Sequence, residues 1–306
     1  MRNQRLVQFS LIAMFFLWFA PDGSTLSKPV AHGATEKKAP APLQTLPLPN
    51  REGTLKFLVL GDFGTGGTTQ KELGAQMARL IKTFPAELVI TVGDNIYGSE
   101  NSQDFKRKFE DPYREVLDAG VKFYASLGNH DAREQSHYDL FNMGGRTYYS
   151  MTPPRQRVKF IAIESDYPTP EQIDWLRQEL RSGEDWIFPY FHHPLYSSGK
   201  WHGSNLSLRK VLEPMFLASN VTVVFAGHDH FYERTKPQHG VTHFVVGSGG
   251  KLRRGDINTR SGLTAKGFDT DLAFLAVEID KDQMHFAAIS RTGAIVDSGV
   301  IERRKS

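Results

Sequence analysis

The sequence contains no cysteine. This excludes a disulfide framework, a thiolate metal site, a cysteine nucleophile and lipid attachment at a cysteine. Any metal ion must therefore be held by nitrogen and oxygen ligands. The chain also lacks a long basic block, because the charged residues behind its net charge of +3 are interspersed. That pattern gives little support for nucleic-acid binding, so we expect no nucleic-acid partner.

The N-terminal hydrophobic run, residues 6–20, is shorter than the roughly 20 residues of a membrane-spanning helix and is interrupted by Gln8 and Ser10. Arg2 and Arg5 precede it, and small and turn-forming residues follow it. A charged start, an apolar run and small residues are the layout of a secretory signal peptide. We therefore expect export to the periplasm or the extracellular space and no stable membrane insertion; an uncleaved anchor is the alternative.

Composition divides the chain into three segments. Residues 1–33 are the predicted signal peptide, with the cleavage position left open. Residues 34–50 are rich in Pro and Ala and predict a linker. Residues 51–306 carry the strand and helix patterns and are long enough to bury a large core.

Short apolar runs bounded by glycine or polar residues predict buried strands. In the first part of the chain they fall at residues 55–60, 88–92, 121–127, 157–163, 186–191 and 221–225. Helical patterns separate several of these runs, at residues 71–82, 105–119, 169–180 and 206–217. Alternation of this kind predicts an α/β fold with a mostly parallel sheet.

The pattern changes after residue 231. Further strands are predicted at residues 241–246, 272–279, 284–289 and 294–301, with no convincing helix between them. This favours antiparallel strands that form a second sheet. The polar segment 249–269, rich in Gly and Arg, predicts an exposed loop.

Polar side chains follow five of the predicted strands. They are Asp62, Asp94, Asn129 with His130, His192, and His228 with His230. Groups at the carboxyl ends of strands in an α/β sheet converge on one crevice. Each feature alone has a simpler interpretation, since Gly-Asp after a strand is a common turn and the histidine pair could be two loop histidines. Together with the phenol of Tyr97, however, the set is sufficient for two metal ions, and two-metal sites serve phosphoester hydrolysis.

Five short segments carry these residues: Gly-Asp-Phe-Gly at 61–64, Gly-Asp-Asn-Ile-Tyr at 93–97, Gly-Asn-His-Asp at 128–131, Phe-His-His-Pro-Leu-Tyr at 191–196 and Gly-His-Asp-His at 227–230. In this order they resemble the five motif blocks of the purple acid phosphatases, within the calcineurin-like metallophosphoesterases. The resemblance extends over residues 55–301 and is to the small, mammalian-type members. It implies that residues 51–306 form a catalytic domain, with a four-layer αββα sandwich of two mixed sheets flanked by helices.

Carried over residue by residue, the resemblance also implies a ligand set. One metal, Fe(III), would be held by Asp62, Tyr97 and His230; the other, Fe(II), Zn(II) or Mn(II), by Asn129, His192 and His228; and Asp94 would bridge them. The superfamily usually begins with Asp-Xaa-His, whereas this chain has Gly64, so Tyr97 would replace the missing ligand. The His-Xaa-Pro spacing favours His192 over the adjacent His193 as the ligand.

The resemblance further implies two catalytic histidines. His130 would donate a hydrogen bond to a phosphate oxygen, and His202 would protonate the leaving alkoxide. The spacing from His192 to His202 departs slightly from that of the small members, so an ordinary loop histidine is the alternative there. Asp131 and Glu164 are candidates for orienting the ligand histidines.

These implications define the expected function. It is an exported phosphatase that hydrolyses small phosphate monoesters by in-line attack of metal-bound hydroxide. A phosphodiesterase that uses the same centre on nucleotides or lipid head groups is the first alternative. A non-catalytic metal- or phosphate-binding module is the second, but it would predict lost ligands, and all of them are present. The sequence leaves the natural substrate and the oligomeric state open.

Overall fold

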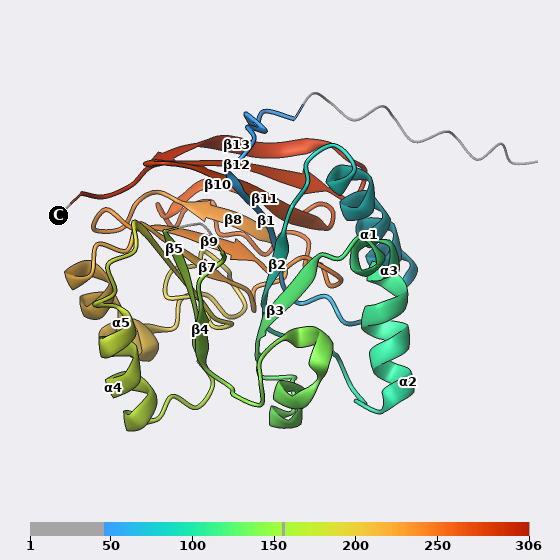
Figure 1. Ribbon diagram of the computed structural model, residues 1–306, viewed down its shortest axis with the longest axis horizontal. Helices are drawn as coiled ribbons and strands as arrows, with labels where there is room; N and C mark the ends of the chain where they lie inside the picture. Colours follow the sequence, from blue (N-terminus) through green and yellow to red (C-terminus); the bar gives the residue numbers. More distant parts are fainter. Residues whose placement is uncertain (1–45, 155–156, 306) are drawn as a thin grey trace, which may run out of the picture. The chain divides into compact units, whose positions relative to one another are not determined.

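Two β-sheets form the centre of a computed structural model that describes residues 46–154 and 157–305 (Figure 1). The described residues belong to the compact unit Pro40–Ser306. The predicted signal peptide and most of the predicted linker lie outside the described residues. Among the helices within the described ranges, none has both the length and the apolar character that crossing a membrane requires.

The first sheet has six strands in the order β13-β12-β11-β1-β2-β3. Their bounds are β1 Leu55–Leu60, β2 Leu88–Val92, β3 Lys122–Ser126, β11 Ala273–Asp280, β12 Gln283–Ser290 and β13 Ile295–Glu302. Strands β1, β2 and β3 pair in parallel. The pairs β1–β11, β11–β12 and β12–β13 are antiparallel, so the sheet is mixed.

The second sheet has seven strands in the order β10-β8-β9-β7-β6-β5-β4. Their bounds are β4 Tyr149–Met151, β5 Val158–Ala162, β6 Trp186–Tyr190, β7 Val223–Ala226, β8 Tyr232–Thr235, β9 Thr242–Val246 and β10 Thr264–Phe268. Strands β5, β6, β7 and β9 form its parallel centre. Antiparallel neighbours flank this centre on both sides, so the second sheet is mixed as well.

Aromatic side chains fill the space between the two sheets. The ring of Phe57 on β1 lies 5.0 Å from that of Phe160 on β5 and 6.0 Å from that of Phe225 on β7. Phe244 on β9 and Phe286 on β12 lie 5.1 Å apart and extend this contact. Because the central strands are buried on both faces, they appear in the sequence as continuous apolar runs.

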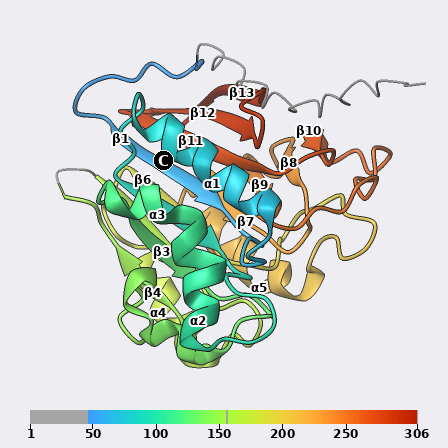
Figure 2. The same ribbon diagram turned by 90° about the vertical axis from the view of Figure 1, so that its right-hand side faces the viewer.

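Helices cover the outer faces of both sheets (Figures 1 and 2). Next to the first sheet lie α1 Thr68–Ile81, α2 Ser102–Phe105, a π-helical turn Lys106–Glu110 and α3 Asp111–Asp118. Next to the second lie α4 Pro170–Glu179 and α5 Leu206–Ala218, whose apolar residues share a core cluster with β5, β6 and β7. The oxygen Oγ1 of Thr169 caps α4 by accepting a hydrogen bond of 3.2 Å from the Gln172 amide. The predicted four-layer αββα sandwich is confirmed.

The prediction for the last third of the chain was wrong in its sheet assignment. Strands β11, β12 and β13 do not make a second sheet; they extend the first one, because β11 pairs along the free edge of β1. Strand β9 joins the second sheet in parallel with β7. The segment 249–269 is also more than an exposed loop, since it contains β10, which pairs with β8, and the buried residues Asp256 and Ile257.

Candidate metal centre

The predicted ligands lie where parallel strands end. Asp62, Asp94 and His228 have φ angles of 54°, 51° and 72°, a backbone region that costs non-glycine residues about 1–3 kcal/mol. Hydrogen bonds between the loops hold this conformation, including Asp62 N to Gly93 O at 2.9 Å and Gly227 N to His192 O at 2.9 Å. Strain of this kind persists only where the surroundings impose it, and it is concentrated at functional sites.

Glycines allow these loops to approach one another. A Cβ atom on Gly227 would lie 2.5 Å from Oδ2 of Asp62, and one on Gly128 would lie 2.3 Å from Oδ1 of Asp94. A side chain at either position would collide with a carboxylate. The Gly-Asp and Gly-His pairs in the sequence therefore reflect close backbone packing around the site.

Three predicted ligands form a first cluster. The Tyr97 hydroxyl oxygen lies 3.2 Å from Oδ1 of Asp62 and 3.4 Å from Nε2 of His230. The distance from Nε2 of His230 to Oδ1 of Asp62 is 3.5 Å. These are the three residues that the family resemblance assigned to one metal.

The position of Tyr97 depends on Gly64. The Tyr97 amide donates to the Gly64 carbonyl at 3.0 Å, and a Cβ atom on Gly64 would lie only 1.9 Å from the carbonyl oxygen of Asn95. A histidine at position 64 cannot fit this arrangement. The phenol of Tyr97 instead reaches the cluster from the neighbouring loop, as the family resemblance implied.

The other three predicted ligands form a second cluster. Nε2 of His192 lies 3.1 Å from Oδ1 of Asn129 and 3.0 Å from Nδ1 of His228. The opposite nitrogen of His192, Nδ1, is 2.9 Å from the carbonyl oxygen of Val92 and donates to it. This bond fixes the tautomer and leaves the lone pair of Nε2 directed at the cluster.

Asp94 belongs to both clusters. Its Oδ1 lies 3.4 Å from Nε2 of His192, and it forms, with Asp62 and His230, a group whose ligand atoms lie within 4.8 Å of one another. Donor atoms that each bind one ion at about 2.0–2.2 Å, at roughly right angles, are about 3 Å apart. The separations therefore fit two adjacent cations that share Asp94.

His193 also lies beside the second cluster, although the spacing argument set it aside. It groups with His192 and His228 within the same 4.8 Å limit, and its ring centre is 4.4 Å from that of His228. Its Nδ1 is 3.1 Å from the hydroxyl of Ser165. Burial, followed by the charge of His192, lowers the pKa of His193 to about 4.

Both predicted catalytic histidines are brought to the site. The His130 amide donates to Oδ1 of Asp94 at 3.1 Å, and its ring centre lies 5.0 Å from that of Tyr97. The ring centre of His202 lies 4.0 Å from that of His228. Burial, and then the charge of Arg253, lower the pKa of His202.

Asp229 connects the loop of His202 to the metal-binding loop. Its carboxylate accepts a 2.5 Å hydrogen bond from the hydroxyl of Ser197 and a 3.2 Å bond from the Gly203 amide. Because Asp229 lies between His228 and His230 in the chain, the loop from 197 to 203 is fixed relative to both clusters.

Of the two predicted orienting carboxylates, neither bonds a ligand histidine. Asp131 accepts from the backbone amides of Asn95, Ile96 and Gly128 and so links two ligand-bearing loops. Glu164 accepts from the amide of Asp166 within its own loop. The prediction was wrong for both carboxylates, because the backbone oxygen of Val92 orients His192 instead.

Burial governs the electrostatics of the clusters. It raises the pKa of Asp62 and, together with the carboxylates of Asp62 and Asp94, raises the pKa of Tyr97. It also lowers the pKa of His228, so that imidazole stays neutral. A bound cation reverses the preference of such carboxyl and phenol groups, because it favours their ionised forms.

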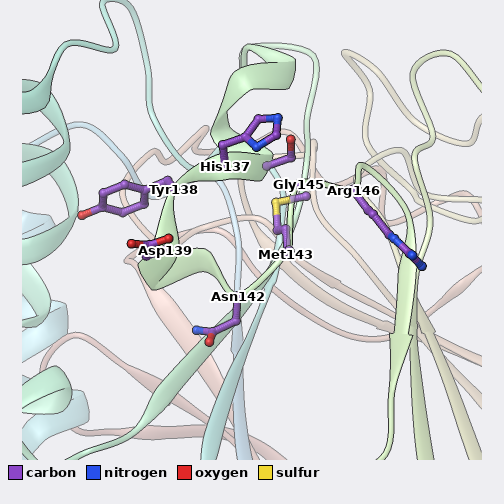
Figure 3. A pocket seen from close by; sticks show the side chains of 9 residues that line it. His137, Tyr138, Asp139, Asn142, Met143, Gly145 and Arg146 are labelled. Carbon is purple, nitrogen blue, oxygen red and sulfur yellow. The ribbon is translucent and has the colours of Figure 1, made fainter.

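A cavity of about 700 Å³ lies away from these ligands, in the connection between β3 and β4 (Figure 3). It is lined by Ser136, His137, Tyr138, Asp139, Asn142, Met143, Gly144, Gly145 and Arg146. None of the predicted site residues lines it.

Sequence reasoning missed two cations at the centre. Nζ of Lys251 lies 3.6 Å from the ring centre of Tyr97, and Arg253 lies over the ring of Trp201. The only signal was the richness of segment 249–269 in Gly and Arg, which was interpreted as an exposed loop.

Comparisons with known proteins agree with this geometry. The family model described as calcineurin-like phosphoesterase matches residues 55–232. Tartrate-resistant acid phosphatase type 5 of Mus musculus is 26% identical over 245 residues, covering 64% of this chain and 72% of the relative. Purple acid phosphatase 7 of Arabidopsis thaliana is 25% identical and covers 98% of both chains.

Solved structures show the same fold. Purple acid phosphatase PPD1 from yellow lupin (Lupinus luteus) seeds superposes with a TM-score of 0.68 at 18% identity, covering 84% of this chain and 55% of that one. GAP50, the anchor in the inner membrane complex of Plasmodium, gives a TM-score of 0.71 at 20% identity, covering 82% and 90%. The family match spans more than half of the sequence, and the chain is therefore a hydrolase that belongs to the calcineurin-like phosphoesterase family.

Proposed function

We propose that this protein hydrolyses phosphate monoesters at a dinuclear metal centre, as an acid phosphatase. The observation that carries the proposal is the convergence of seven side chains from five strand ends into two clusters that share Asp94. The names of its relatives, tartrate-resistant and purple acid phosphatases, support the same activity.

The proposed ligand sets follow the two clusters. Asp62, Tyr97 and His230 would hold one ion, Asn129, His192 and His228 would hold the other, and Asp94 would contribute to both. A phenolate with carboxylates suits Fe(III), whereas two imidazoles with oxygen donors suit Fe(II), Zn(II) or Mn(II). When bound, the ions would supply Lewis acidity toward the phosphate and acidify a water molecule.

The remaining chemistry falls to residues of the chain. His130, which lies beside Asp94 and Tyr97, donates a hydrogen bond to a phosphate oxygen. His202, over the ring of His228, gives a proton to the leaving alkoxide. Asp229 keeps His202 in place through its bonds to the loop from 197 to 203.

The replacement Asp94→Asn tests the proposal, because Asp94 is the residue common to both clusters. The variant should fold, bind less metal and hydrolyse p-nitrophenyl phosphate at least about 100-fold more slowly, as expected when the ligand shared by two ions is weakened. The exposed Asp118→Asn is the matched control and should retain both properties. A folded Asp94→Asn protein with unchanged metal content and turnover would contradict the proposal.

The same assay separates the phosphodiesterase alternative. Relative rates on p-nitrophenyl phosphate and bis-p-nitrophenyl phosphate should favour the monoester. Faster turnover of the diester by the wild-type protein would contradict the phosphomonoesterase proposal and support the phosphodiesterase alternative.

We also propose that the protein is exported, with residues 1–33 as signal peptide, residues 34–50 as linker and residues 51–306 as catalytic domain. The charged and apolar pattern of the N-terminus supports this division. N-terminal sequencing of the exported protein should find a start near residue 34. Recovery of the full chain with its N-terminus intact would contradict cleavage.

A further inference from the structure

A buried lysine is bonded to the loop that carries Tyr97. Lys108 is only 4% exposed, although lysine is rarely buried unless it is paired. Its Nζ donates hydrogen bonds to the carbonyl oxygens of Tyr97 at 2.7 Å and of Ser99 at 2.6 Å. Nζ also lies 3.0 Å from Oδ1 of Asp104, which is buried as well. An ammonium group has three donors, and these three oxygens use all of them.

The local helix geometry directs Lys108 inward. It is the third residue of the π-helical turn Lys106–Glu110, which lies between α2 and α3. The preceding Lys106 and Arg107 are exposed, whereas Lys108 and Phe109 are buried. π-helical turns are rare and frequently lie at functional sites. Here the turn brings a lysine to the backbone of a ligand-bearing loop.

A buried glutamine connects Lys108 to the loop of Asp62. The side chain of Gln70 on α1 donates from Nε2 to the carbonyl oxygen of Lys108 at 2.6 Å. Its Oε1 accepts a 2.7 Å hydrogen bond from the amide of Gly66, four residues after Asp62. The loops that follow β1 and β2, which carry Asp62 and Tyr97, are therefore attached to the same helical turn.

The ammonium group fixes a short piece of backbone that has no other support. In the described part of the chain, no other donor is bonded to the carbonyl oxygen of Tyr97 or of Ser99. Between them lies Gly98, whose φ angle of 77° belongs to the region that favours glycine. Stability alone is a weak reason for the ion pair of Lys108 and Asp104, because desolvation offsets the attraction within a buried pair. Its charge-assisted bonds to the two carbonyl groups instead give the loop a defined direction.

We propose that Lys108 is a positioning residue for the metal centre, and that its ammonium group holds the backbone of Tyr97 so that the phenol reaches the first cluster. This inference rests on the ligand set of the proposed function. The phenol oxygen lies 3.2 Å from Oδ1 of Asp62, a separation that a displaced loop would change. Loss of a residue that orients a metal ligand typically costs about 10–100-fold in metal affinity.

The test is Lys108→Met, which keeps most of the length of the side chain and removes its donors. We expect the affinity of the first cluster for its metal, measured by competition with a chelator, to fall by about 10–100-fold. The visible absorption band of a ferric ion bound to a phenolate should weaken or shift, because it depends on the geometry of the ligand. Lys106→Met is the matched control. Lys106 is exposed and bonds Asp111, so this variant should keep the wild-type affinity and band.

A double variant separates positioning from a purely structural ion pair. Lys108→Met leaves the buried Asp104 with only the exposed Arg107 as its cation, and an incompletely paired buried charge destabilises the fold. Asp104→Leu combined with Lys108→Met removes both charges and should regain part of the stability in urea unfolding. Because the carbonyl oxygen of Tyr97 still lacks its donor, the double variant should keep the weakened metal affinity. It decides the question if Lys108→Met does not fold.

The variant Tyr97→Phe distinguishes this inference from the proposed function. If Tyr97→Phe changes neither the metal content nor the visible spectrum, the proposed ligand set is refuted, and the inference with it. If Tyr97→Phe removes the band but Lys108→Met keeps it, with an affinity within about twofold of wild type, only the role of Lys108 is refuted. Return of the wild-type affinity and band in the double variant would likewise leave Lys108 and Asp104 as an ion pair without a positioning role.

Discussion

A single carboxylate, that of Asp131, holds two ligand-bearing loops together, and Asp131→Asn tests its contribution. Its Oδ2 accepts from the amide of Asn95 at 3.0 Å, from Nδ2 of Asn95 at 3.0 Å and from the amide of Gly128 at 2.9 Å. Its Oδ1 accepts from the amide of Ile96 at 3.0 Å and from Nε2 of Gln135 at 2.8 Å. The donor residues are buried, so water cannot readily replace a lost acceptor.

The size of the effect follows from this arrangement. An asparagine amide retains one acceptor oxygen, and if this oxygen faces Asn95 and Gly128, the NH₂ group opposes the donors of Ile96 and Gln135. Each buried donor without an acceptor costs about 1–3 kcal/mol, so the variant should lose roughly 2–6 kcal/mol of its free energy of unfolding. The free energy of unfolding of a domain is typically about 5–15 kcal/mol, so the variant should still fold.

The loss should also reach the metal centre. Ile96 directly precedes Tyr97, so release of its amide should weaken metal retention at the cluster of Asp62, Tyr97 and His230 first. Urea unfolding of the metal-free protein measures the stability, and metal analysis after dialysis measures retention. The control is Asp118→Asn, at an exposed position. If Asp131→Asn changes the unfolding free energy by less than about 1 kcal/mol and retains both metals, the loops do not depend on this carboxylate.

Three further changes test other parts of the structure. Gly64→Ala should displace the loop at Asn95, because the carbonyl oxygen of Asn95 would lie 1.9 Å from the new Cβ. The free energy of unfolding measured in urea should fall by about 1–3 kcal/mol, and the metal content should fall as well. Unchanged values of both would refute the close contact. Burial lowers the pKa of His243 from 6.5 to about 3. Between these two pH values the unfolded chain binds one more proton at this residue than the folded protein does. The free energy of unfolding therefore falls as the pH falls through this window, by up to about 1.4 kcal/mol per pH unit. His243→Gln should flatten that dependence in melting temperatures measured from pH 6.5 to 4, and an unaltered slope would contradict the assignment. Arg234→Met should lower stability in urea by up to about 3 kcal/mol, because it removes the 2.8 Å ion pair with Asp297 that joins β8 to β13. Adding Asp297→Asn, which keeps an acceptor for the Tyr232 hydroxyl, should recover part of the loss, and no recovery would argue against an unpaired charge as its cause.

The sequence predicted the fold class because the strands leave a strong local signal. Residues 55–60 and 88–92 are buried on both faces, and such strands appear as continuous apolar runs. The edge strands β4 and β10, and β8 next to β10, were not predicted. Strand β4 has only three residues, β8 contains mostly polar residues, and β10 is only partly buried. Segments of this kind become strands because they pair with a neighbouring strand, and their composition does not predict it.

Pairing between distant segments could not be predicted in the same way. The antiparallel strands of the last third were expected to form their own sheet, yet β11 pairs with β1, more than 200 residues away in the chain. The local sequence of an apolar strand is compatible with pairing in either sheet. Which sheet it joins depends on how much apolar surface the two sheets bury together. The positions of Lys251 and Arg253 were missed for the same reason, because a loop with many Gly and Arg residues looks exposed until its backbone bonds to Asp62 and His230 are known.

The sequence by itself determined which side chains could act together, because order and spacing place Asp62, Asp94, Asn129, His192, His228 and His230 after strands whose ends converge. The family resemblance implied how they divide between two metals, and the tertiary structure decided that they meet in two clusters, since distances of 3.0–3.5 Å between donor atoms depend on loops that meet only after both sheets pack. It also decided the surroundings of those clusters: the close contact at Gly64 that excludes a side chain there, and the positions of Lys251 and Arg253 at the edge of the site. Local motifs thus predict which residues are candidate ligands. The charges beside the metal centre, in contrast, depend on contacts between segments far apart in the chain.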